Sequence, residues 1–350
     1  MRRPARSRVR ALGACLVIAA SGFSAAQEAH AQSVEQFFKG KTIDAIIGFA
    51  AGGGNDLYVR AVSRYIGRHI PGNPTVVARN MPGAGTMLAT NNVANSARRD
   101  GTTLALGAST LPLDEKFGSD GVRFKSAELN WIGRITPRVD IIMMWKTSPV
   151  KTIQDAMKYR SVLAGTTVGS PVVMYPNLLN NVIGTKFKIV RGYAGSREGL
   201  LALEKGEAEG HSTSREALFS AHPDWVQNRD VNIIVQFSLT RAPDLPDVPA
   251  AVELGRTPDE TQILRTVMNT TAIGLSLFTT PGVPADRLAA LRRAFDATMV
   301  DNEFLTELKK LGGIAEPLEG EKLQQLVAEV ADLSPALTEK AKAAYQHLSD

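Results

Sequence analysis

The stretch IDAIIGFAAGGGNDLYVRAVSRYI, residues 43–66, joins an apolar run to three successive glycines and then to a helical pattern. The apolar run predicts a strand over residues 42–49, and the spacing of the later apolar side chains predicts a helix over residues 56–70. One face of this helix, which we interpret as solvated, carries three arginines: Arg60, Arg64 and Arg68. The stretch is therefore typical of a strand–loop–helix unit.

The three glycines leave the start of the predicted helix open. The first backbone N–H groups of a helix have no partner within the helix, and the helix dipole adds a partial positive charge there. Gly52, Gly53 and Gly54 carry no Cβ that would keep a ligand from these amides, and Asn55 or Asp56 can cap the helix. Such a place binds anions.

A second unit of the same design follows along the chain. Residues 74–81 predict a strand and residues 85–97 a helix, and the string RNMPGAGTM places Gly83 and Gly85 between them. Two glycine-lined helix starts at one sheet edge predict a concave anion site, as expected for open α/β sheets. From the residues alone, the alternative that these glycines only make tight turns stays open.

The glycine loops fit a carboxylate better than a nucleotide. The dinucleotide fingerprint fails in both loops, because Leu57 and Leu88 stand where its last glycine is required. The triplet Gly40-Lys41-Thr42 resembles the end of a phosphate loop, but it precedes its strand instead of following one. Since the first glycine loop contains no Lys or Arg, an anion of modest charge is expected.

The sequence contains no group of residues typical of a catalytic site. No Gly-x-Ser-x-Gly motif occurs, and Glu204, Glu207 and Glu209 are interpreted as a solvated helix end and turn. The later histidines are not at metal-ligand spacing and are interpreted as surface or structural residues: His69, His211, His222 and His347. We expect no metal, no cofactor and no enzymatic activity, and an exported hydrolase or lyase remains an alternative function.

Residues 1–31 predict a secretory signal peptide that is cleaved. Five arginines without an acid precede a short apolar run, and Ala29–Ala31 offers small residues at the cleavage positions. The only cysteine, Cys15, leaves with this segment, so the mature chain is expected to lack disulfides. We therefore expect a protein that is exported from the cytoplasm.

The signal peptide also explains the basic character of the full chain. The 350 residues contain 40 Lys and Arg and 35 Asp and Glu, a net charge of +5. Without residues 1–31, five arginines and one glutamate are lost, so 35 basic and 34 acidic residues leave a net charge of +1. A nearly neutral chain gives no argument for binding to nucleic acid or to a membrane surface.

The chain after residue 31 predicts an α/β fold in two lobes. Short β-rich runs alternate with amphipathic stretches, and the alternation restarts after residues 140–145. The C-terminal part predicts helices that pack back on the first lobe, at residues 284–300, 302–312 and 321–348.

Longer strings resemble the substrate-binding receptors of tripartite tricarboxylate transporters, the Bug family. They begin with FFKGKTIDAIIGFAAGGGNDLYVRAVSRYI, NMPGAGTMLATNNVA and DGTTLALG. The likeness continues through LNWIGR, KTIQDAM, GTKFKIVRGYAGS, LEKGEAEG, LPDVPAAVELG and PGVPADRLAALRRAF, in the order of the family. It covers essentially the whole chain after residue 31.

The resemblance implies a periplasmic binding protein of the two-lobed, type II-like class. Residues 32–142 plus 276–350 would form lobe 1 and residues 143–275 lobe 2, with a hinge between them. Such a receptor, expected as a monomer, would close on a small carboxylate, often a di- or tricarboxylate, and deliver it to a permease of two other subunits. A receptor that feeds a sensor kinase would have the same sequence features and is a further alternative.

The resemblance also implies the ligand-binding residues. In lobe 1 the carboxylate would meet backbone and small polar groups of Ala51, Gly52, Gly53, Gly54, Asn55, Asp56, Gly83, Ala84 and Gly85, with Ser109 as a further candidate. In lobe 2 the opposite wall would come from Gly169, Ser170, Tyr193, Ala194, Gly195 and Ser196. This chain departs from the family pattern at Ala51, Asn55, Pro171 and Glu209, and these departures bear on the identity of the ligand.

Overall fold

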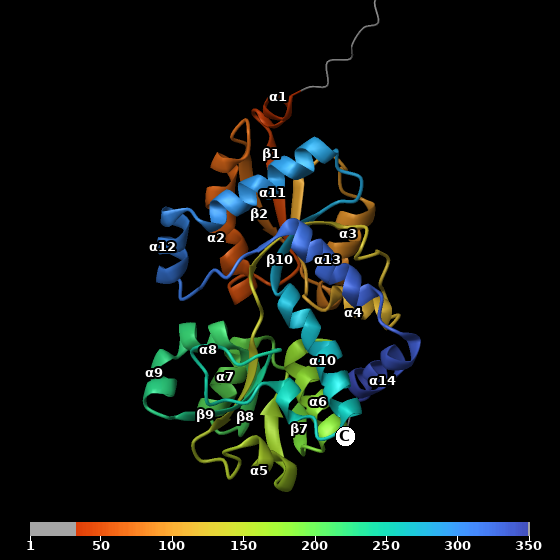
Figure 1. Cartoon of the computed structure of the whole chain (residues 1–350). Coiled ribbons are helices and arrows are strands. Elements are labelled where there is room, and N and C mark those ends of the chain that lie inside the picture. Colours follow the sequence, from red (N-terminus) through yellow and green to blue (C-terminus); the bar gives the residue numbers. More distant parts are fainter. Residues whose placement is uncertain (1–32, 349–350) are drawn as a thin grey trace, which may run out of the picture. The chain divides into compact units, whose positions relative to one another are not determined.

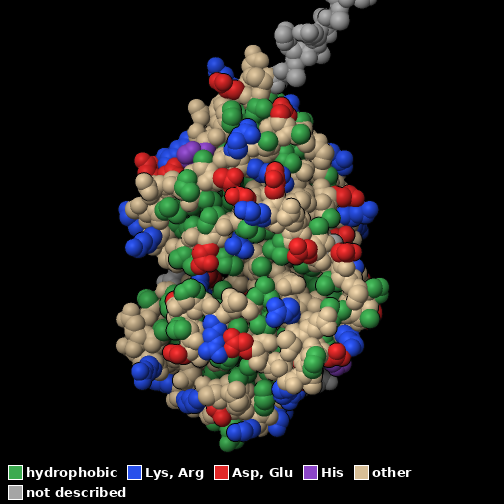
Figure 2. Space-filling model, in the orientation of Figure 1, with side chains coloured by type: hydrophobic (Ala, Val, Ile, Leu, Met, Phe, Trp, Pro, Cys, Tyr) green, Lys and Arg blue, Asp and Glu red, His purple; other side chains and the backbone are tan. Residues whose placement is uncertain are grey.

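A computed structural model describes residues 33–348 of the chain (Figure 1). The predicted signal peptide lies outside the described residues. On the face of the molecule that Figure 2 shows, acidic and basic side chains are interspersed, in line with the near balance of the two after residue 31.

Six strands form the first sheet of the described chain, in the order β11-β4-β10-β3-β1-β2. β1 pairs in parallel with β2 and β3, whereas β10 runs antiparallel to β3 and β4. The strand bounds are β1 Thr42–Ile47, β2 Thr75–Asn80, β3 Thr103–Leu106, β4 Asn130–Thr136, β10 Leu275–Thr279 and β11 Leu318–Glu319. Because β1, β2 and β3 are parallel, the loops that follow them lie at one edge of the sheet.

Helices cover both faces of this sheet (Figure 1). α2 packs against β2, α11 and α12, and α11 also packs on β4. The contact with β4 is close, since a Cβ on Gly133 would lie 2.2 Å from Cε1 of Phe295. The helices that belong here are α1 Val34–Phe38, α2 Gly54–His69, η1 Ala84–Thr86, α3 Met87–Asn95, α4 Leu111–Lys116, α11 Ala285–Met299 and α12 Asn302–Lys310.

A second sheet of five strands has the order β7-β6-β8-β5-β9 within the described residues. β6 pairs in parallel with β7 and β8, and β5 runs antiparallel to β8 and β9. Its strands are β5 Asp140–Trp145, β6 Ser161–Ala164, β7 Phe187–Val190, β8 Gly210–Ser214 and β9 Val231–Phe237. Its helices are α5 Ile153–Lys158, α6 Pro171–Ile183, α7 Ser196–Glu204, α8 Arg215–Ala221, α9 Pro223–Gln227 and η2 Ala251–Leu254.

Three further helices complete the described chain: α10 Pro258–Ile273, α13 Gly320–Ala331 and α14 Pro335–Gln346. α13 packs on β4 and α4 of the first sheet, as expected for the C-terminal helices. α14 instead packs on α6 and α10. The expectation that all C-terminal helices return to the first sheet is therefore wrong for α14.

The predicted α/β organisation is confirmed, and most predicted elements are present. The strand predicted at residues 42–49 ends at Ile47, and the helix predicted from residue 56 begins at Gly54. The single helix predicted over residues 321–348 is wrong, because Ser334 caps a new helix by accepting a hydrogen bond from the Leu337 amide. The following Pro335 fits the first turn of α14 and cannot continue α13.

Candidate ligand-binding site

The loop between β1 and α2 leaves the start of a 16-residue helix uncapped. Gly53 is the N-cap residue, in an extended conformation, and no side chain accepts a hydrogen bond from the first turn. The prediction that Asn55 or Asp56 caps the helix is wrong, because α2 begins at Gly54 and both residues already belong to its first turn. The unpaired amides at this helix start remain available for an acceptor from outside.

Open space surrounds the glycines of this loop. An ideal Cβ on Gly52 or Gly54 would meet no atom within 4 Å, and one on Gly53 would meet only the Ala50 carbonyl oxygen at 4.0 Å. Ala51, Gly52 and Gly53 are exposed, whereas Asn55 is half-buried. Glycine at position 52 has a conformational reason, since its φ is +83°. At positions 53 and 54, in contrast, nothing in the fold fills the space where side chains would be.

Asp56 holds the loop in place from within and is 5% exposed. Its carboxylate accepts hydrogen bonds from the Gly52 amide at 2.9 Å, from Asn80 Nδ2 at 2.8 Å and from Arg60 Nε at 2.9 Å. All of these partners belong to the protein, so Asp56 supports the loop. That Asp56 also contacts the ligand, as the resemblance implies, stays a prediction.

Sequence reasoning missed Asn80 and the role of Arg60. Asn80 ends β2 and donates from Nδ2 to the Phe49 carbonyl at 3.0 Å, while Arg60 donates to its Oδ1 at 2.6 Å. The residues Asp56, Asn80 and Arg60 thus tie the ends of β1 and β2 together. The sequence did offer one signal for Asn80, because it is a polar residue near the carboxyl end of a predicted strand.

The three arginines of α2 are also more than a solvated face. Arg60 pairs with Asp56, Arg64 with Glu307, and Arg68 with Asp301 and Glu303. The last three acids belong to α12 or cap it, so this face of α2 binds another helix through ion pairs. Arg64 and Arg68 are exposed, as predicted, but their ion pairs with α12 and its cap were not predicted.

The loop after β2 has an unusual backbone. Gly83 has a φ of +151°, Gly85 of +61°, and the non-glycine residues Ala84 and Thr86 have φ values of +45° and +78°. A left-handed conformation costs a non-glycine residue about 1–2 kcal/mol. Gly83, Ala84 and Gly85 are exposed, so this turn presents its main chain to the solvent. Non-glycine residues held in this way are frequent at functional sites.

Thr86 fixes this turn to the other two loops of the sheet edge. Its Oγ1 accepts a hydrogen bond from the Ala108 amide at 3.0 Å, and its carbonyl accepts one from Thr90 Oγ1 at 3.1 Å. Its side chain also lies against the backbone after β1, because a Cβ on Gly48 would be 2.8 Å from Thr86 Cβ. Thr86 therefore joins the loops after β1, β2 and β3.

Replacement of Gly48 by alanine is expected to destabilise the protein. The added methyl group would displace Thr86 and the turn it holds, and overpacking of this kind costs about 1–3 kcal/mol. Urea unfolding measures the loss, with Gly54→Ala as the control, because a Cβ there meets nothing within 4 Å. Equal stability of the two variants would contradict the role of Thr86.

Ser109 lies one residue beyond the amide that Thr86 binds. It is 6% exposed, and its hydroxyl group has no hydrogen-bond partner within the described residues. A buried hydroxyl group usually has a partner, and each exception calls for an explanation. An oxygen of a bound ligand at this sheet edge would supply one.

The predicted residues of the second sheet also lie at the carboxyl ends of parallel strands. Gly169 and Ser170 follow β6, and residues 193–196 follow β7. The two loops touch, because the Tyr193 amide donates to the Gly165 carbonyl at 3.2 Å. The Ser170 hydroxyl group bonds within its own loop, to Thr166 Oγ1 at 2.7 Å and to the Thr167 carbonyl at 2.8 Å.

The structure therefore brings the predicted residues together in two groups, one at the edge of each sheet. The loops with Ala51–Asp56, Gly83–Gly85 and Ser109 form the first group. The loops with Gly169, Ser170 and residues 193–196 form the second, in which Ala194 is exposed and Gly195 is the N-cap residue of α7, without a side-chain cap. That both groups contact one ligand stays a prediction.

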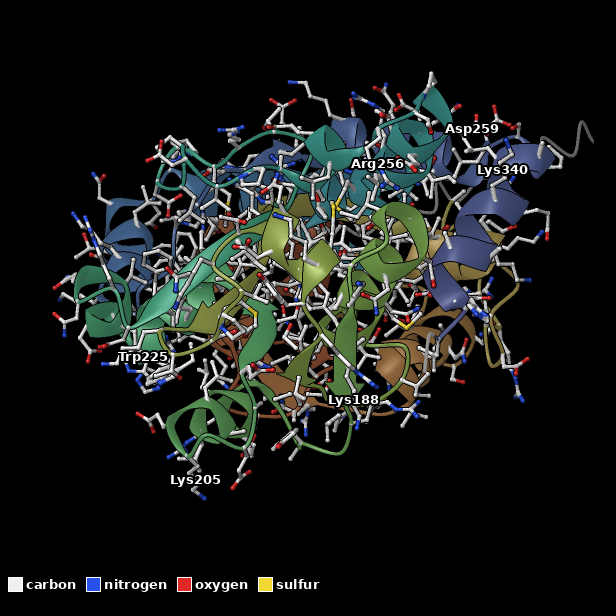
Figure 3. All side chains as sticks on the ribbon, turned by 90° about the horizontal axis from the view of Figure 1, so that it is seen from below. Lys188, Lys205, Trp225, Arg256, Asp259 and Lys340 are labelled. Atoms are coloured by element: carbon white, nitrogen blue, oxygen red, sulfur yellow. The ribbon has the colours of Figure 1, made fainter. Side chains whose placement is uncertain are left out.

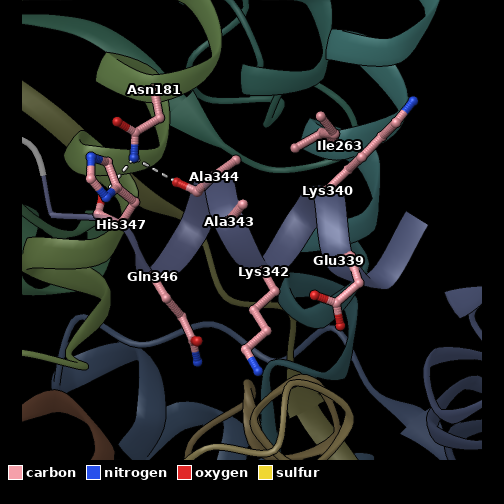
Figure 4. Close-up of a pocket in the computed structure, with 9 residues that line it drawn as sticks. All are labelled: Asn181, Ile263, Glu339, Lys340, Lys342, Ala343, Ala344, Gln346 and His347. Carbon is pink, nitrogen blue, oxygen red and sulfur yellow. Dashed lines mark hydrogen bonds between the residues drawn. The ribbon is translucent and has the colours of Figure 1, made fainter. Parts of the chain in front are cut away.

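A surface pocket elsewhere in the described chain has a volume of about 840 Å³ (Figure 4). It lies along α14, and its lining includes Ile263 and the ends of Glu339 and Lys342. Asn181 closes one end by donating to the carbonyl groups of Ala344 at 2.8 Å and His347 at 2.7 Å. No predicted ligand-binding residue lines this pocket.

His211 and Glu209, two polar residues in or next to β8, have structural roles. His211 is fully buried, its Nδ1 lies 2.9 Å from the Ala164 carbonyl, and burial lowers its pKa to about 4. Glu209 accepts the Val162 amide at 2.8 Å and so joins β8 to β6, which corrects its interpretation as part of a solvated turn. Residues 33–348 contain no group of acids and histidines suited to a metal ion, nor a helix long and apolar enough to cross a membrane.

The Asp56 carboxyl group is expected to stay ionised over the physiological pH range. Burial raises its pKa, but hydrogen bonds from Arg60, Gly52 and Asn80 outweigh burial and hold the pKa below the ordinary value of 3.8. Because the pKa of Asp56 is lower in the folded state than in the unfolded state, its ionised carboxylate stabilises the fold fully at pH values above the unfolded-state pKa. This stabilisation is lost as the pH falls through the folded-state pKa.

The Gly52 amide resonance, followed by NMR, is therefore expected to stay constant from about pH 8 to about pH 5 and to move only in stronger acid. An Asp56→Asn variant should remove this transition. A titration of the wild-type resonance above about pH 4 would contradict the arrangement of hydrogen bonds.

Comparisons with solved structures define the fold class. The chain is similar to the periplasmic binding protein BugD, with a TM-score of 0.65 and 21% identity over 87% of this chain and 97% of that one. It is also similar to MatC from Rhodopseudomonas palustris, solved with bound malate, with a TM-score of 0.62 and 22% identity over 86% of this chain and 99% of that one. The fold is that of two-lobed periplasmic binding proteins, as predicted.

The family follows from the sequence. The model of the tripartite tricarboxylate transporter family receptor matches residues 62–342, and the chain belongs to this family. A curated relative, the UPF0065 protein in the gbd 5' region of Cupriavidus necator, is 28% identical over 258 residues, which are 68% of this chain and 73% of the relative. Members of the family are solute receptors and not enzymes, which confirms the prediction of a receptor.

Proposed function

We propose that this receptor binds a small carboxylate, a di- or tricarboxylate by preference, and delivers it to the membrane subunits of a tripartite transporter. Residues 1–31 would direct its export to the periplasm. Residues 32–142 plus 276–331 would form one lobe and residues 143–275 the other, with α14 packed on α6 and α10 of the second lobe, and the monomer would close around the ligand. The malate bound to MatC, a structural relative, agrees with this class of ligand.

The uncapped start of α2 is the observation that carries the proposal. The Gly52 amide already donates to Asp56, but the amides of Gly53 and Gly54 border space that no protein atom fills. The helix dipole gives them a partial positive charge, and anions bind well at such places. The positive charge of Arg60, on the same helix, is matched by Asp56. A site that combines partial charges with a neutral ion pair suits a carboxylate better than a polyphosphate.

Ser109 and the second loop extend this site. The orphan hydroxyl group of Ser109 and the exposed turn of Gly83, Ala84 and Gly85 lie at the same sheet edge as α2. A carboxylate has two oxygens and about four acceptor positions. Donors from three loops can therefore share one carboxylate group, which supports a small ligand held by its charged end.

Closure of the lobes would make binding selective. A ligand that bonds loops of both sheets favours the closed form by its differential affinity, and about 5.5 kcal/mol reverses a 1:99 population. The chain passes from one sheet to the other next to Arg138, whose amide donates to the Thr271 carbonyl at 2.9 Å. Bending of these two neighbouring segments is the expected hinge motion.

A thermal-shift screen tests the proposal. Purified protein is heated with C3 to C10 mono-, di- and tricarboxylates, with the matching neutral amides and with inorganic phosphate. One or more carboxylates should raise the Tm by several degrees, since ligand at 100 times its Kd contributes about 2.7 kcal/mol. A response to phosphate or to the amides, and to no carboxylate, would contradict the proposal.

A further inference from the structure

Four exposed basic side chains gather at the start of β6 and β7: Lys158, Arg160, Lys186 and Lys188, which we call the basic corner. The parallel register places Arg160, just before β6, opposite Lys186, just before β7. Lys186 Nζ donates to the Lys158 carbonyl at 3.1 Å, and Lys188 points to the same face of its strand as Lys186. The four positive charges therefore share one surface.

Within the described residues, no acid forms an ion pair with the basic corner. The sequence contains no Asp or Glu between Asp155 and Glu198. Asp155 itself is engaged in the capping box of α5, where it accepts the Thr152 amide at 3.0 Å. Over residues 33–348, none of the four members forms an ion pair. Other basic residues near the second sheet do, since Lys146 pairs with Asp230 and Arg256 with Glu260.

The basic corner borders a free strand edge. β7 is the last strand of its sheet, and parallel pairing directs the amide and carbonyl groups of Phe187 and Ile189 away from β6. Asn180 covers Phe187, with bonds of 3.0 Å to its amide and 2.8 Å to its carbonyl. In the part of the chain that the structure describes, no partner covers the same groups of Ile189. Figure 3, seen from below, shows the labelled Lys188 among these strands and apart from the ion pair of Lys340 and Asp259.

Two exposed apolar side chains lie close to members of the basic corner in the sequence. Tyr159, between Lys158 and Arg160, is 51% exposed, and Val190 at the end of β7 is 38% exposed. A single lysine suffices to protect a strand edge against aggregation. A group of four unpaired charges beside an open edge and exposed apolar side chains fits an extended polypeptide with acidic residues, which could add to the edge and pair with the bases.

We propose that the basic corner and the Ile189 edge form the docking surface for an acidic, extended segment of the transporter's membrane subunits. This inference rests on the proposed delivery of ligand to such subunits. The charges would speed the encounter, because complementary surfaces raise association rates at low salt. The free edge distinguishes the partner from an anionic lipid surface, since lipid headgroups need no strand to pair with.

The test uses the full mature receptor and its cognate membrane subunits in phosphatidylcholine nanodiscs. The triple variant Lys158→Glu, Lys186→Glu, Lys188→Glu is compared with wild type by biolayer interferometry. A control variant, Lys39→Glu, Lys309→Glu, Lys310→Glu, changes the net charge equally at other exposed lysines. Nanodiscs without subunits, made with one part phosphatidylglycerol to three parts phosphatidylcholine, measure binding to lipid alone.

Wild type and control should bind the subunits with Kd values within a factor of two, and the triple variant should bind about tenfold more weakly or worse, mainly through a slower association. Wild-type binding should also weaken with salt. Equal affinity of all three proteins, absence of binding to the subunits, or equal binding to the anionic nanodiscs would overturn the inference. The carboxylate screen is independent, so a failure of docking with intact Tm shifts is distinguishable from a failure of the carboxylate site.

Discussion

Replacement of Gly53 by valine is expected to abolish carboxylate binding and to leave the protein folded. Gly53 has a φ of −87° and a ψ of 170°, which valine adopts without strain. Its Cβ would approach only the Ala50 carbonyl oxygen, at 4.0 Å. The branched side chain would occupy the space in which the ligand reaches the amides of α2. Loss of two charge-assisted hydrogen bonds weakens binding about 100-fold or more.

Stability and binding are measured separately for this variant. Valine is a poorer N-cap residue than glycine, but loss of glycine also reduces the entropy of the unfolded chain, so the free energy of unfolding should change by less than about 1 kcal/mol. Glu319→Val is the control, since Glu319 is the N-cap residue of α13, also extended and also without a side-chain cap bond. Unchanged ligand affinity of Gly53→Val by calorimetry would remove the loop from the site.

Replacement of Asp56 by alanine is expected to abolish binding by a different route. The Gly52 amide and Asn80 each lose an acceptor, and the loop between β1 and α2 loses the bonds that join it to β2. Deletion of a buried hydrogen-bonded carboxylate costs about 2–4 kcal/mol. Chemical denaturation should show this loss, and calorimetry should show no binding.

The control for Asp56 is Asp155→Ala, which removes the corresponding carboxylate from the capping box of α5. It should cost about 1 kcal/mol of stability and leave the ligand affinity unchanged. If Asp56 acts through the loop, Asn80→Ala should weaken binding too, because it removes a donor to the same carboxylate and the bond to the Phe49 carbonyl. Unchanged affinity of Asn80→Ala would speak for a direct contact between Asp56 and the ligand.

The sequence was informative where one local pattern determines the structure. The apolar run over residues 42–47 and the glycines after it define β1, its loop and the start of α2, and the structure differs by at most two residues. The parallel arrangement of β1 and β2 then places both glycine loops at one edge. The fold class and the first group of candidate residues follow from such patterns.

Sequence reasoning failed where contacts between residues far apart in the sequence determine the role of a side chain. Asp56 looked like a cap or a ligand contact, but its partner Asn80 is brought to it only by the pairing of β1 with β2. Thr86 gave no signal in the sequence, because its role depends on Gly48 and Ala108, which belong to other loops. Support of this kind is a property of the folded sheet edge and not of any one segment.

The strand β8 escaped prediction for a related reason. Its sequence is GHSTS, and His211, Ser212 and Thr213 are fully buried although they are polar. The strand has no apolar alternation that could identify it, and neighbouring strands on both sides, β5 and β6, determine its place. The break between α13 and α14 was visible in the sequence as Ser334-Pro335, and the long apolar periodicity of residues 321–348 obscured it.

The most direct measurement is an NMR titration of the ¹⁵N-labelled protein with the acid that raises its Tm most. Amide hydrogens that bond a carboxylate shift strongly. The resonances of Gly53, Gly54 and Asn55 should move most, together with those of Ala84 and Gly85, while the amides around the α14 pocket should stay in place. If the acid binds and these five resonances do not move, the ligand is held elsewhere and the account of the site is wrong.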